Sequence, residues 1–381
     1  MRRYSSAGKN HTTIGYGKPS SLGWAAALRR NELSQDIFRH ERKKTYLCKR
    51  FNDKHKSINM QHTYAIGIDV GGTNTDMGLV RSDGTILSRR NLPTNQYTNF
   101  PLYIRDVMQQ MNEMVREQGI GDITGIGIGA PNGNFYTGCV DNAPNLTMKG
   151  VLNFAEEMHK HRDVKVVLSN DANAAAYGEL VYGGAKGMQH FIMFTLGTGV
   201  GSGIVVDGKL VHGFTGGAGE LGHNILIPDG RACSCGRKGC LEAYTSARGI
   251  VRTYCETRQE EGYNAPIKLG WIGMEIPDAD ITSKMIGDAA NVGDPVALRT
   301  YEKTARWLGI AMANAVTFSA PEAIFLMGGP SKVGDPLLTP LRASFEEHLL
   351  NIYHGTCDIR MSQLKSNEVA ILGAAALIEM K

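Results

Sequence analysis

The segment "YAIGIDVGGTNTDMGLV" at residues 64–80 has a counterpart further along the chain, "HFIMFTLGTGVGSGIVVDGKLV" at residues 190–211. In both, an apolar run typical of a buried strand enters a turn of glycine and threonine, and a second strand-like run follows at once. This repetition of strand, turn and strand indicates an internal duplication. We therefore predict two related α/β units, each beginning with a hairpin.

The chain after residue 60 alternates between strand-like and helix-like patterns. Alternation of this kind predicts an α/β architecture in two lobes, with the glycine turns gathered at the cleft between them. Apolar residues at helical spacing, or apolar runs ended by glycine, mark the individual elements. Further strands are expected at 123–133, 163–171 and 321–329, and helices at 99–119, 172–183, 245–317 and 367–381.

The composition is that of an ordinary soluble globular protein. The 381 residues suffice for two domains, and 42% of them are apolar and 20% charged. No apolar run approaches the length of a membrane span, and the N-terminus lacks the apolar core of a secretion signal. Seven cysteines, four of them scattered singly, form a poor disulfide framework and suit a reducing compartment. We expect a cytoplasmic protein without a membrane partner.

Residues 1–59 are strongly basic. They contain 14 lysines and arginines and only 4 aspartates and glutamates, whereas residues 60–381 are mildly acidic. Such an arm could bind nucleic acid, but it lacks the apolar pattern of a helix-turn-helix. Met60 stands just before the first strand, so translation could also start there. We favour a disordered or dispensable extension and expect no nucleic-acid partner.

Two turns have the composition of a phosphate cradle. "DVGGTNTD" at 69–76 and "TLGTGVGSG" at 195–203 place glycines and threonines directly after an apolar strand, where backbone N–H groups and hydroxyls can donate to phosphate oxygens. Asp69 could hold water on a Mg²⁺ ion that bridges the phosphates. A glycine pair after a third strand suits the nucleoside end. The candidate nucleotide contacts are Asp69, Gly71, Gly72, Thr73, Asn74, Thr198, Gly199, Gly201, Gly328 and Gly329.

Neither turn matches a common nucleotide fingerprint. The chain contains no G-x-x-x-x-G-K-[ST] at these places, so they are not P-loops. The turn at 195–203 continues into a partner strand of a hairpin, whereas a Rossmann turn enters a helix. Either turn alone could be a plain β-turn. Two turns of one design in the same chain favour a nucleotide.

Asp171 follows the strand at 163–169 and stands at the start of a helix. As an acidic N-cap it would satisfy free helix N–H groups, and its loss would cost about 1 kcal/mol. A carboxylate at the carboxyl end of a central strand would also face the cleft, where it could accept a proton from a hydroxyl that attacks a γ-phosphate. Its ordinary pKa of about 4 keeps it ionised at neutral pH. Spacing alone leaves both roles open.

Three cysteines and one histidine crowd into "GELGHNILIPDGRACSCGRKGCLEAY" at residues 219–244. Cys233, Cys235 and Cys240 follow the pattern Cys-x-Cys-x₄-Cys, and His223 precedes them by ten residues. Four nitrogen and sulfur ligands are the number for tetrahedral structural zinc and leave no open position for catalysis. Such crowding in a polar, glycine-rich loop disfavours three ordinary cysteines.

Seven runs taken together resemble, in order, the motifs of the ROK family of sugar kinases. They are GIDVGGTNTD, GIGIGAPNG, NDANAAAYGE, FTLGTGVGSGIVVDGKL, GGAGELGH, CSCGRKGCLEAY and LGAAAL, and the resemblance covers residues 64–378. It implies a two-lobed actin-like ATPase fold, of the ribonuclease H-like kind, with a nucleotide cleft and an inserted zinc loop. The implied parts are the basic extension 1–59, an N-terminal lobe 60–168 completed by the helix 369–381, and a C-terminal lobe 169–368 that contains the zinc loop 219–244.

The same resemblance implies roles for single residues. The family's catalytic base falls on Asp171, and its zinc ligands fall on His223, Cys233, Cys235 and Cys240. One ring nitrogen of His223 would bind zinc while the other faces the sugar. The family's sugar contacts fall on Gly133, Asn170, Asp171, Glu220, His223 and Glu242.

The chain departs from the family pattern at two places. It has "APNGN" at 130–134, where many members have "APGPV", so the place of Gly133 in the sugar pocket is approximate. Asp76 is an unusual charged residue in the first hairpin. Both departures leave the choice of sugar open.

These patterns predict a kinase that transfers the γ-phosphoryl group of ATP to a hexose hydroxyl, with glucose O6 as the first choice. ATP, Mg²⁺ and structural Zn²⁺ would be its cofactors, and N-acetylmannosamine, N-acetylglucosamine and fructose suit the same set of hydroxyl-binding groups. The family also includes sugar-responsive transcriptional repressors, which only the basic arm supports here. A non-catalytic sugar-binding module is weakened by the two phosphate turns. Family analogy suggests a homodimer or homotetramer.

Overall fold

A computed structural model describes residues 62–262, 267–268, 275–276 and 278–380. Residues 62–381 form one compact unit. The extension expected at 1–59 lies outside the described residues, and the boundaries of the two lobes stay predictions. Among the helices of the described part, none is both long enough and apolar enough to cross a bilayer.

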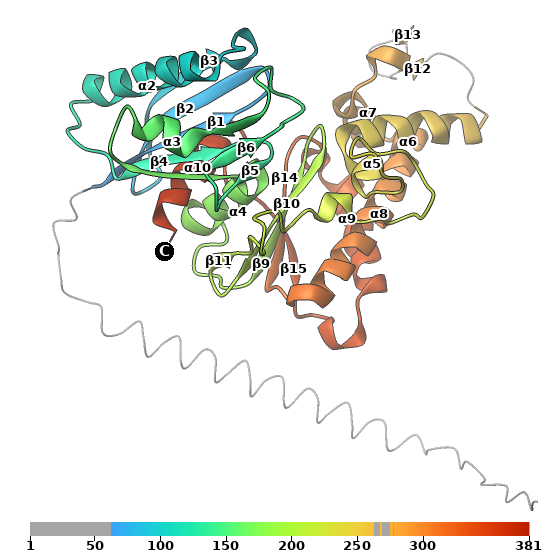
Figure 1. Ribbon diagram of the computed structural model, residues 1–381. Helices are drawn as coiled ribbons and strands as arrows, with labels where there is room; N and C mark the ends of the chain where they lie inside the picture. The colour runs from blue at the N-terminus through green and yellow to red at the C-terminus, as the bar shows by residue number, and fades with distance from the viewer. Residues whose placement is uncertain (1–61, 263–266, 269–274, 277, 381) are drawn as a thin grey trace, which may run out of the picture. The chain divides into compact units, whose positions relative to one another are not determined.

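Two five-stranded sheets share one connectivity (Figure 1). In each, three consecutive antiparallel strands are followed by two strands parallel to the first of them. The sheet order is β3-β2-β1-β4-β8 in one and β11-β10-β9-β14-β15 in the other. This shared order confirms the α/β fold in two related units. The strands are β1 (Tyr64–Val70), β2 (Asn74–Arg81), β3 (Ile86–Pro93), β4 (Gly125–Gly129), β8 (Lys165–Ser169), β9 (Phe191–Leu196), β10 (Val200–Val206), β11 (Lys209–Leu210), β14 (Ala323–Met327) and β15 (Asp358–Met361).

Two smaller sheets complete the strand inventory of the described residues. A three-stranded antiparallel sheet follows β4, and a two-stranded one follows helix α6 (Ala247–Glu260). Their strands are β5 (Gly133–Asn134), β6 (Cys139–Asp141), β7 (Val151–Asn153), β12 (Ile267–Lys268) and β13 (Glu275–Ile276).

Helices occupy most of the remaining described chain. The α-helices are α2 (Phe100–Glu117), α3 (Phe154–His159), α4 (Asp171–Tyr182), α5 (Glu242–Thr245), α6 (Ala247–Glu260), α7 (Ser283–Asn291), α8 (Pro295–Ser319), α9 (Asp335–His348) and α10 (Val369–Ala376). The 3₁₀ helices are η1 (Thr94–Gln96), η2 (Leu221–His223), η3 (Asp278–Asp280), η4 (Pro330–Val333), η5 (Asn351–Tyr353) and η6 (Leu377–Glu379).

The strands of the first sheet bury side chains on both faces. Ile66 and Ile68 point to the face that α2 covers, because side chains alternate along a strand. Helix α2 begins where Asn99 caps it by accepting a hydrogen bond from the N–H of Leu102, and a proline follows in its first turn. The opposite face of the sheet contacts α10.

Glycines in β1 and β4 let α10 lie directly on the backbone of the sheet. A Cβ at Gly67 would come within 2.0 Å of the carbonyl oxygen of Ile371, and one at Gly127 within 1.8 Å of that of Ala374. Any other residue at these positions would push the helix away. The glycine spacing in "GIDVGG" and "GIGIG" is thus partly a packing requirement.

The second sheet is also covered on both faces. Ile192 and Phe194 of β9 pack with residues of α8, whereas Phe191 and Met193 pack with residues of α4. Helices α4 and α10 in turn contact each other, so they form the layer between the two sheets.

The helix pair α4 and α10 crosses at glycine. A Cβ at Gly178 would stand 2.7 Å from the Cα of Gly373, so only two glycines allow this close approach. Next to the crossing, the buried carboxylate of Glu179 accepts hydrogen bonds from the N–H groups of Gly184 and Gln363 at 2.7 and 3.0 Å. Glu179 therefore joins the segment after α4, which leads to the second sheet, to the segment before α10, which returns to the first sheet.

Several elements have no counterpart among the expected ones. Strand β15, helix α9 and the sheet β5-β6-β7 lie in stretches where short apolar groups are interrupted by polar residues and turns. The expected long elements match: α2 lies within the helix expected at 99–119, and the helical stretch expected at 245–317 contains α6, α7 and all but the last two residues of α8.

Candidate functional site

The carboxyl ends of three parallel strands meet at one edge of the first sheet. Asp69 on β1 pairs with Gly129 on β4, and Gly129 pairs with Ser169 on β8. Asp171 begins the helix that follows β8. A Cβ at Gly129 would lie 3.8 Å from Asp69 Oδ1 and 3.7 Å from the Cα of Asp171, so the two aspartates flank this small residue. The edge where parallel strands end is where α/β folds bind ligands.

The helix cap at this edge is Asn170. Its Oδ1 accepts a hydrogen bond of 2.7 Å from the N–H of Asn173, whereas Asp171 accepts one of 2.8 Å from the N–H of Ala172. Asn170 therefore occupies the N-cap position considered for Asp171, while Asp171 satisfies one further N–H group of the first turn. The carboxylate of Asp171 keeps acceptor capacity for another partner.

Burial and like charge raise the pKa values of these acids. Burial raises the pKa of Asp69 to about 7, and the nearby carboxylates of Asp171 and Asp76 add to the effect. Burial also raises the pKa of Asp171, against a lowering by hydrogen bonding to the N–H of Ala172. The Asp171 side chain is nevertheless accessible to solvent.

A pocket of about 560 Å³ opens beside Asp69. Asp76 pairs with Asp69 across the hairpin, and its Oδ1 accepts a hydrogen bond of 2.8 Å from Asn91. Arg89 and Arg90 also line the pocket. Two facing carboxylates repel each other unless a cation lies near them, so this acidic group suits a Mg²⁺ ion that arrives with a nucleotide.

The two glycine–threonine turns present backbone donors. Among the described residues, none accepts a hydrogen bond from the N–H of Gly72, Thr73, Thr198 or Gly199. The turn after β1 is closed by a 2.9 Å hydrogen bond from the N–H of Gly71 to the carbonyl of Asn74. Free N–H groups on a fixed turn can bind phosphate oxygens.

Other expected nucleotide contacts have packing roles. Gly201 lies within β10, where a Cβ would stand 2.8 Å from Cβ of Ala172. Gly328 has a positive φ of 113°, and a Cβ there would come within 1.9 Å of the Leu196 carbonyl oxygen. Gly329 faces open space, with no atom within 4 Å of the position that a Cβ would take. Gly329 is thus the member of this pair beside which a ligand has room.

The expected sugar contacts lie in one connected group. Gly133 packs on the end of β8, where a Cβ would stand 2.5 Å from the Ser169 carbonyl oxygen. The adjacent Asn170 donates from Nδ2 to Glu220 Oε1 at 3.4 Å. Burial raises the pKa of Glu220, and the nearby His223 opposes this rise.

A second contact joins the same two loops. Asn134 Nδ2, next to Gly133, donates a 2.7 Å hydrogen bond to the carbonyl of Thr215. Tyr136 donates from its hydroxyl to the carbonyl of Gly213 at 2.8 Å. The loop that leads to Glu220 is therefore tied to the loop after β4, which the sequence did not indicate.

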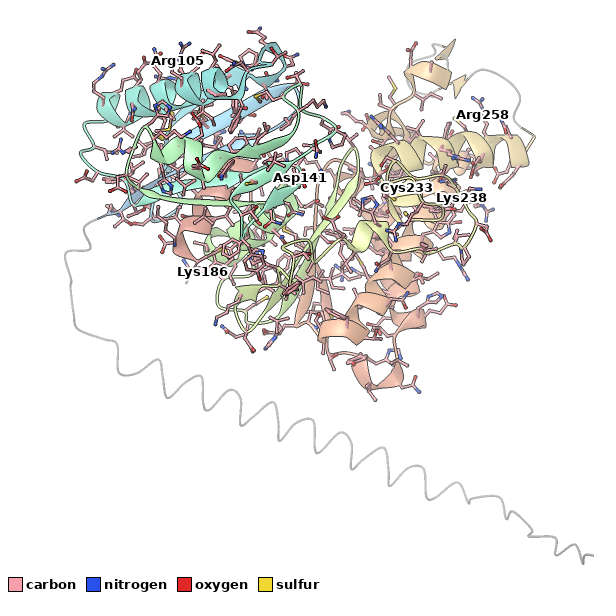
Figure 2. The ribbon with its side chains drawn as sticks, in the orientation of Figure 1. Arg105, Asp141, Lys186, Cys233, Lys238 and Arg258 are labelled. Carbon is pink, nitrogen blue, oxygen red and sulfur yellow. The ribbon has the colours of Figure 1, made fainter. Side chains whose placement is uncertain are left out.

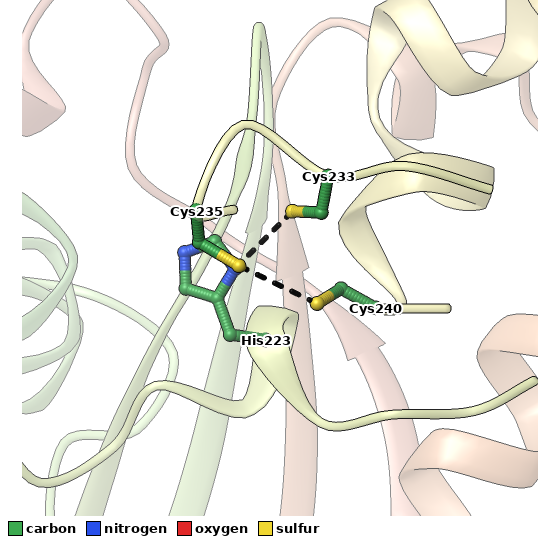
Figure 3. Close-up of side chains that lie close together, drawn as sticks. All are labelled: His223, Cys233, Cys235 and Cys240. Atoms are coloured by element: carbon green, nitrogen blue, oxygen red, sulfur yellow. Dashed lines mark hydrogen bonds between the residues drawn. The ribbon is translucent and has the colours of Figure 1, made fainter. Parts of the chain in front are cut away.

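His223, Cys233, Cys235 and Cys240 bring their ligand atoms within 4.8 Å of one another (Figure 3). His223 Nδ1 lies 3.6 Å from Cys233 Sγ, and the sulfurs of Cys235 and Cys240 are also 3.6 Å apart. Zn–S bonds of about 2.3 Å in tetrahedral geometry separate two sulfurs by roughly 3.8 Å. The four donors thus fit a tetrahedral zinc ion.

Arginines hold this loop in shape. Arg237 donates to the carbonyl of His223 at 2.8 Å, and hydrogen bonding by Arg237 lowers the pKa of Cys235 to about 6, which favours the thiolate. Arg231 is buried, with its guanidinium 4.6 Å from the ring centre of Tyr244 and 5.3 Å from that of Trp307. Figure 2 places Cys233 and Lys238 on this loop, beside the helices of the second sheet. Nothing in the sequence marked Arg231 as a support.

Glu242 bridges the metal cluster and the second glycine turn. Its Oε2 accepts a 3.0 Å hydrogen bond from the N–H of Val200, and its Oε1 accepts one of 2.9 Å from the hydroxyl of Ser234. Cys233 Sγ lies 3.6 Å from the same Oε1. The contact with Val200 was not expected, because residues 200 and 242 are far apart in the chain.

Two paired α/β units, with acidic strand ends and glycine turns, define a member of the actin-like class of nucleotide-binding folds. The chain belongs to the ROK family, whose family model matches residues 65–381. It is 33% identical to a glucokinase of Halalkalibacterium halodurans, covering 84% of this chain and 97% of the relative. It is 36% identical to a glucokinase of Streptomyces coelicolor, covering 82% and 96%.

Solved structures and more distant relatives agree with this placement. The ROK family glucokinase of Streptomyces griseus, solved in complex with glucose and AMPPNP, matches with a TM-score of 0.67 and 33% identity over 82% of this chain and 98% of that one. The xylose repressor of Bacillus subtilis is 25% identical over 84% of this chain and 79% of the repressor. The family thus includes relatives of both the enzyme and the repressor kind, and the glucokinases are the more similar.

Proposed function

We propose that the protein is an ATP-dependent hexose kinase that phosphorylates O6 of glucose. The observation that carries this proposal is the place of Asp171, which lies between the acidic edge at Asp69 and the hydrogen-bonded pair Asn170 and Glu220. One side suits a nucleotide with its cation, and the other suits sugar hydroxyls. Similarity to glucokinases over more than four fifths of the chain, one of them solved with glucose and AMPPNP, supports it.

In this mechanism Asp171 accepts the proton of the attacking hydroxyl. Its raised pKa makes it a better proton acceptor than an aspartate with an ordinary pKa, and it is accessible to solvent. Asn170 and Glu220 orient the sugar, together with Gly133, His223 and Glu242. The free N–H groups of the two glycine turns bind phosphate oxygens, so catalysis rests on positioning and on charge stabilisation.

Mg²⁺ and Zn²⁺ would assist the reaction, but neither would accept the proton of the sugar hydroxyl. Asp69 would hold Mg²⁺, which neutralises the charge of the phosphates. His223 and the three cysteines would hold Zn²⁺, which fixes the loop that carries Glu220 and Glu242.

Replacement of the base tests the mechanism. Asp171→Asn should lower turnover by about 10³-fold, because general base catalysis is lost. Binding of glucose and of a non-hydrolysable ATP analogue, measured by calorimetry, should stay nearly unchanged. Asp163→Asn, an exposed aspartate before the same strand, is the matched control and should keep full activity. Turnover near the wild-type rate in Asp171→Asn would reject the assignment.

A substrate panel tests the choice of sugar. ADP release should be fastest with glucose among hexoses and N-acetylhexosamines. Faster turnover of N-acetylmannosamine, N-acetylglucosamine or fructose would assign the protein to another sugar of the same family.

A further inference from the structure

We propose that Glu242 is a positioning residue that couples the zinc loop, residues 219–244, to the glycine turn at residues 197–200. Nucleotide affinity would then depend on the state of the zinc loop. This inference rests on the proposed kinase function and adds a second role to a residue assigned so far to the sugar alone.

The carboxylate of Glu242 contacts both the glycine turn and the zinc loop. Glu242 Oε2 accepts from the N–H of Val200 at 3.0 Å, and Oε1 accepts from the hydroxyl of Ser234 at 2.9 Å. Ser234 stands between the ligands Cys233 and Cys235, and Cys233 Sγ lies 3.6 Å from Oε1. Cys233 would bind zinc as a thiolate and could no longer donate to Oε1, so the Ser234 hydroxyl is the donor that remains. A bound zinc ion would therefore immobilise the segment that carries Ser234 and, through its hydroxyl, Oε1 of Glu242.

The fit between Glu242 and the turn is close. A Cβ at Gly199 would lie only 2.5 Å from Glu242 Oε2, so glycine is needed there to admit the carboxylate. The segment after Glu242 holds the other end of the turn, because the N–H of Ala247 donates to the carbonyl of Gly197 at 2.8 Å. Residues 242–247 thus clamp both sides of Thr198 and Gly199.

This clamp determines whether the turn can bind phosphate. The N–H groups of Thr198 and Gly199 have no acceptor within the described part of the chain, and they bind phosphate oxygens well only if the turn already has the right shape. Without the hydrogen bond to Val200, part of the binding energy would go into ordering the turn. Hydrogen bonds to a carboxylate are among the stronger ones, so the expected loss of affinity is about tenfold.

Calorimetric binding of a non-hydrolysable ATP analogue with Mg²⁺, in the absence of sugar, tests the coupling. Glu242→Ala should weaken binding about tenfold. Glu242→Gln should keep nucleotide affinity within about threefold, because its amide oxygen can accept from Val200 and its NH₂ group can donate to Ser234. Sugar affinity should fall in both variants. If Glu242 only maintained the fold, each variant would lose nucleotide affinity and sugar affinity together, and Glu242→Gln would not keep the one while it loses the other.

Matched controls keep the test independent of folding. Glu322→Ala removes a carboxylate that accepts from the backbone N–H groups of Gln189 and His190, just before β9 starts, and it should leave nucleotide binding unchanged. Ser234→Ala changes an exposed side chain and should weaken nucleotide binding about threefold. Far-UV circular dichroism checks that each variant is folded.

Metal removal tests the same connection between the zinc loop and nucleotide affinity. Chelation should weaken nucleotide binding in the wild type and cause no further loss in Glu242→Ala, because the connection is already broken there. Equal weakening in both proteins, or wild-type nucleotide affinity in Glu242→Ala, would overturn the coupling alone. A wild type that binds no adenine nucleotide would overturn the kinase function and this inference together.

Discussion

The acidic group at the end of the first sheet lowers the stability of the folded chain. It consists of Asp69, Asp76 and Asp171. Asp76 lies directly across the hairpin from Asp69, and like charges in such a pair are destabilising. Burial and these neighbours raise the pKa of Asp69 to about 7. Because the folded chain disfavours the ionised form, the contribution of Asp69 to the free energy of unfolding falls as the pH rises from about 4 to 7 and is constant above that range.

Asp69→Asn should therefore stabilise the protein at pH 8 in the absence of Mg²⁺ and nucleotide. The gain should be up to about 4 kcal/mol, because the pKa of Asp69 is raised from its ordinary value of about 4 to about 7. At pH 5.5 the gain should be clearly smaller, because Asp69 is then mostly protonated in the folded chain. Urea unfolding at both pH values measures the difference.

The control for this prediction is Asp163→Asn, which should change stability little at either pH. Sugar phosphorylation should be lost in Asp69→Asn, since the neutral amide no longer suits Mg²⁺. A gain of equal size at both pH values would contradict the link to ionisation.

The zinc loop shows how one element serves two purposes. Its glycines, arginines and metal ligands hold a segment with little regular structure, in which η2 and α5 are each a single turn. A metal bound by His223 and three cysteines would fix Glu220 and Glu242 relative to Asn170. In the proposed function the loop would be a sugar-binding segment whose shape a metal ion maintains.

Metal removal should raise the KM for sugar by about tenfold or more, because loss of a structural metal loosens the loop. Kinetics after treatment with a chelator, and in Cys235→Ser, measure the effect. Cys139→Ser, a cysteine outside the cluster, is the control and should behave as the wild type. An unchanged KM in demetallated, folded protein would contradict the coupling of metal to sugar.

The contact of α10 with the first sheet depends on glycine. Gly127→Ala should destabilise the protein by about 3 kcal/mol, because the new Cβ would clash with the Ala374 carbonyl and push the helix away. Gly121→Ala is the matched control, since no atom lies within 4 Å of its Cβ position. Urea unfolding should show a change within about 0.5 kcal/mol for the control. Equal stability of both variants would show that α10 can shift without cost.

At the scale of the whole molecule, the two alternatives to distinguish are a sugar kinase and a DNA-binding repressor. Residues 62–381 form one compact unit, and the two sheets and their helices lie within it. A protein that begins at Met60 should therefore fold and keep full sugar-dependent ADP release, because every proposed site residue lies within this unit.

The full chain and the protein that begins at Met60 should also show equal, weak binding to DNA. Tight, salt-sensitive binding of one DNA sequence by the full chain only would favour the repressor, for which the weaker similarity to xylose repressors is the support. Loss of kinase activity on removal of residues 1–59 would contradict the view that the extension is dispensable.

Local patterns were enough to predict the long elements. Helix α8 follows from an aspartate cap, a proline in the first turn and apolar residues at helical spacing, all of which are local signals. The short strands β5, β6 and β7 escaped prediction because two or three residues carry no periodicity. Strand β15 is four residues long and depends on its neighbour β14 for its hydrogen bonds.

Spacing along the chain predicted the α/β class, the duplicated hairpins and the cluster of one histidine and three cysteines that suits zinc, because strands, turns and close-spaced cysteines are local features. Only the tertiary structure decided that Asn170 caps the helix in place of Asp171, that Asp76 faces Asp69, and that Glu242 reaches Val200. These contacts join residues through register and packing, and the free energy of such contacts depends on distances that no local pattern records.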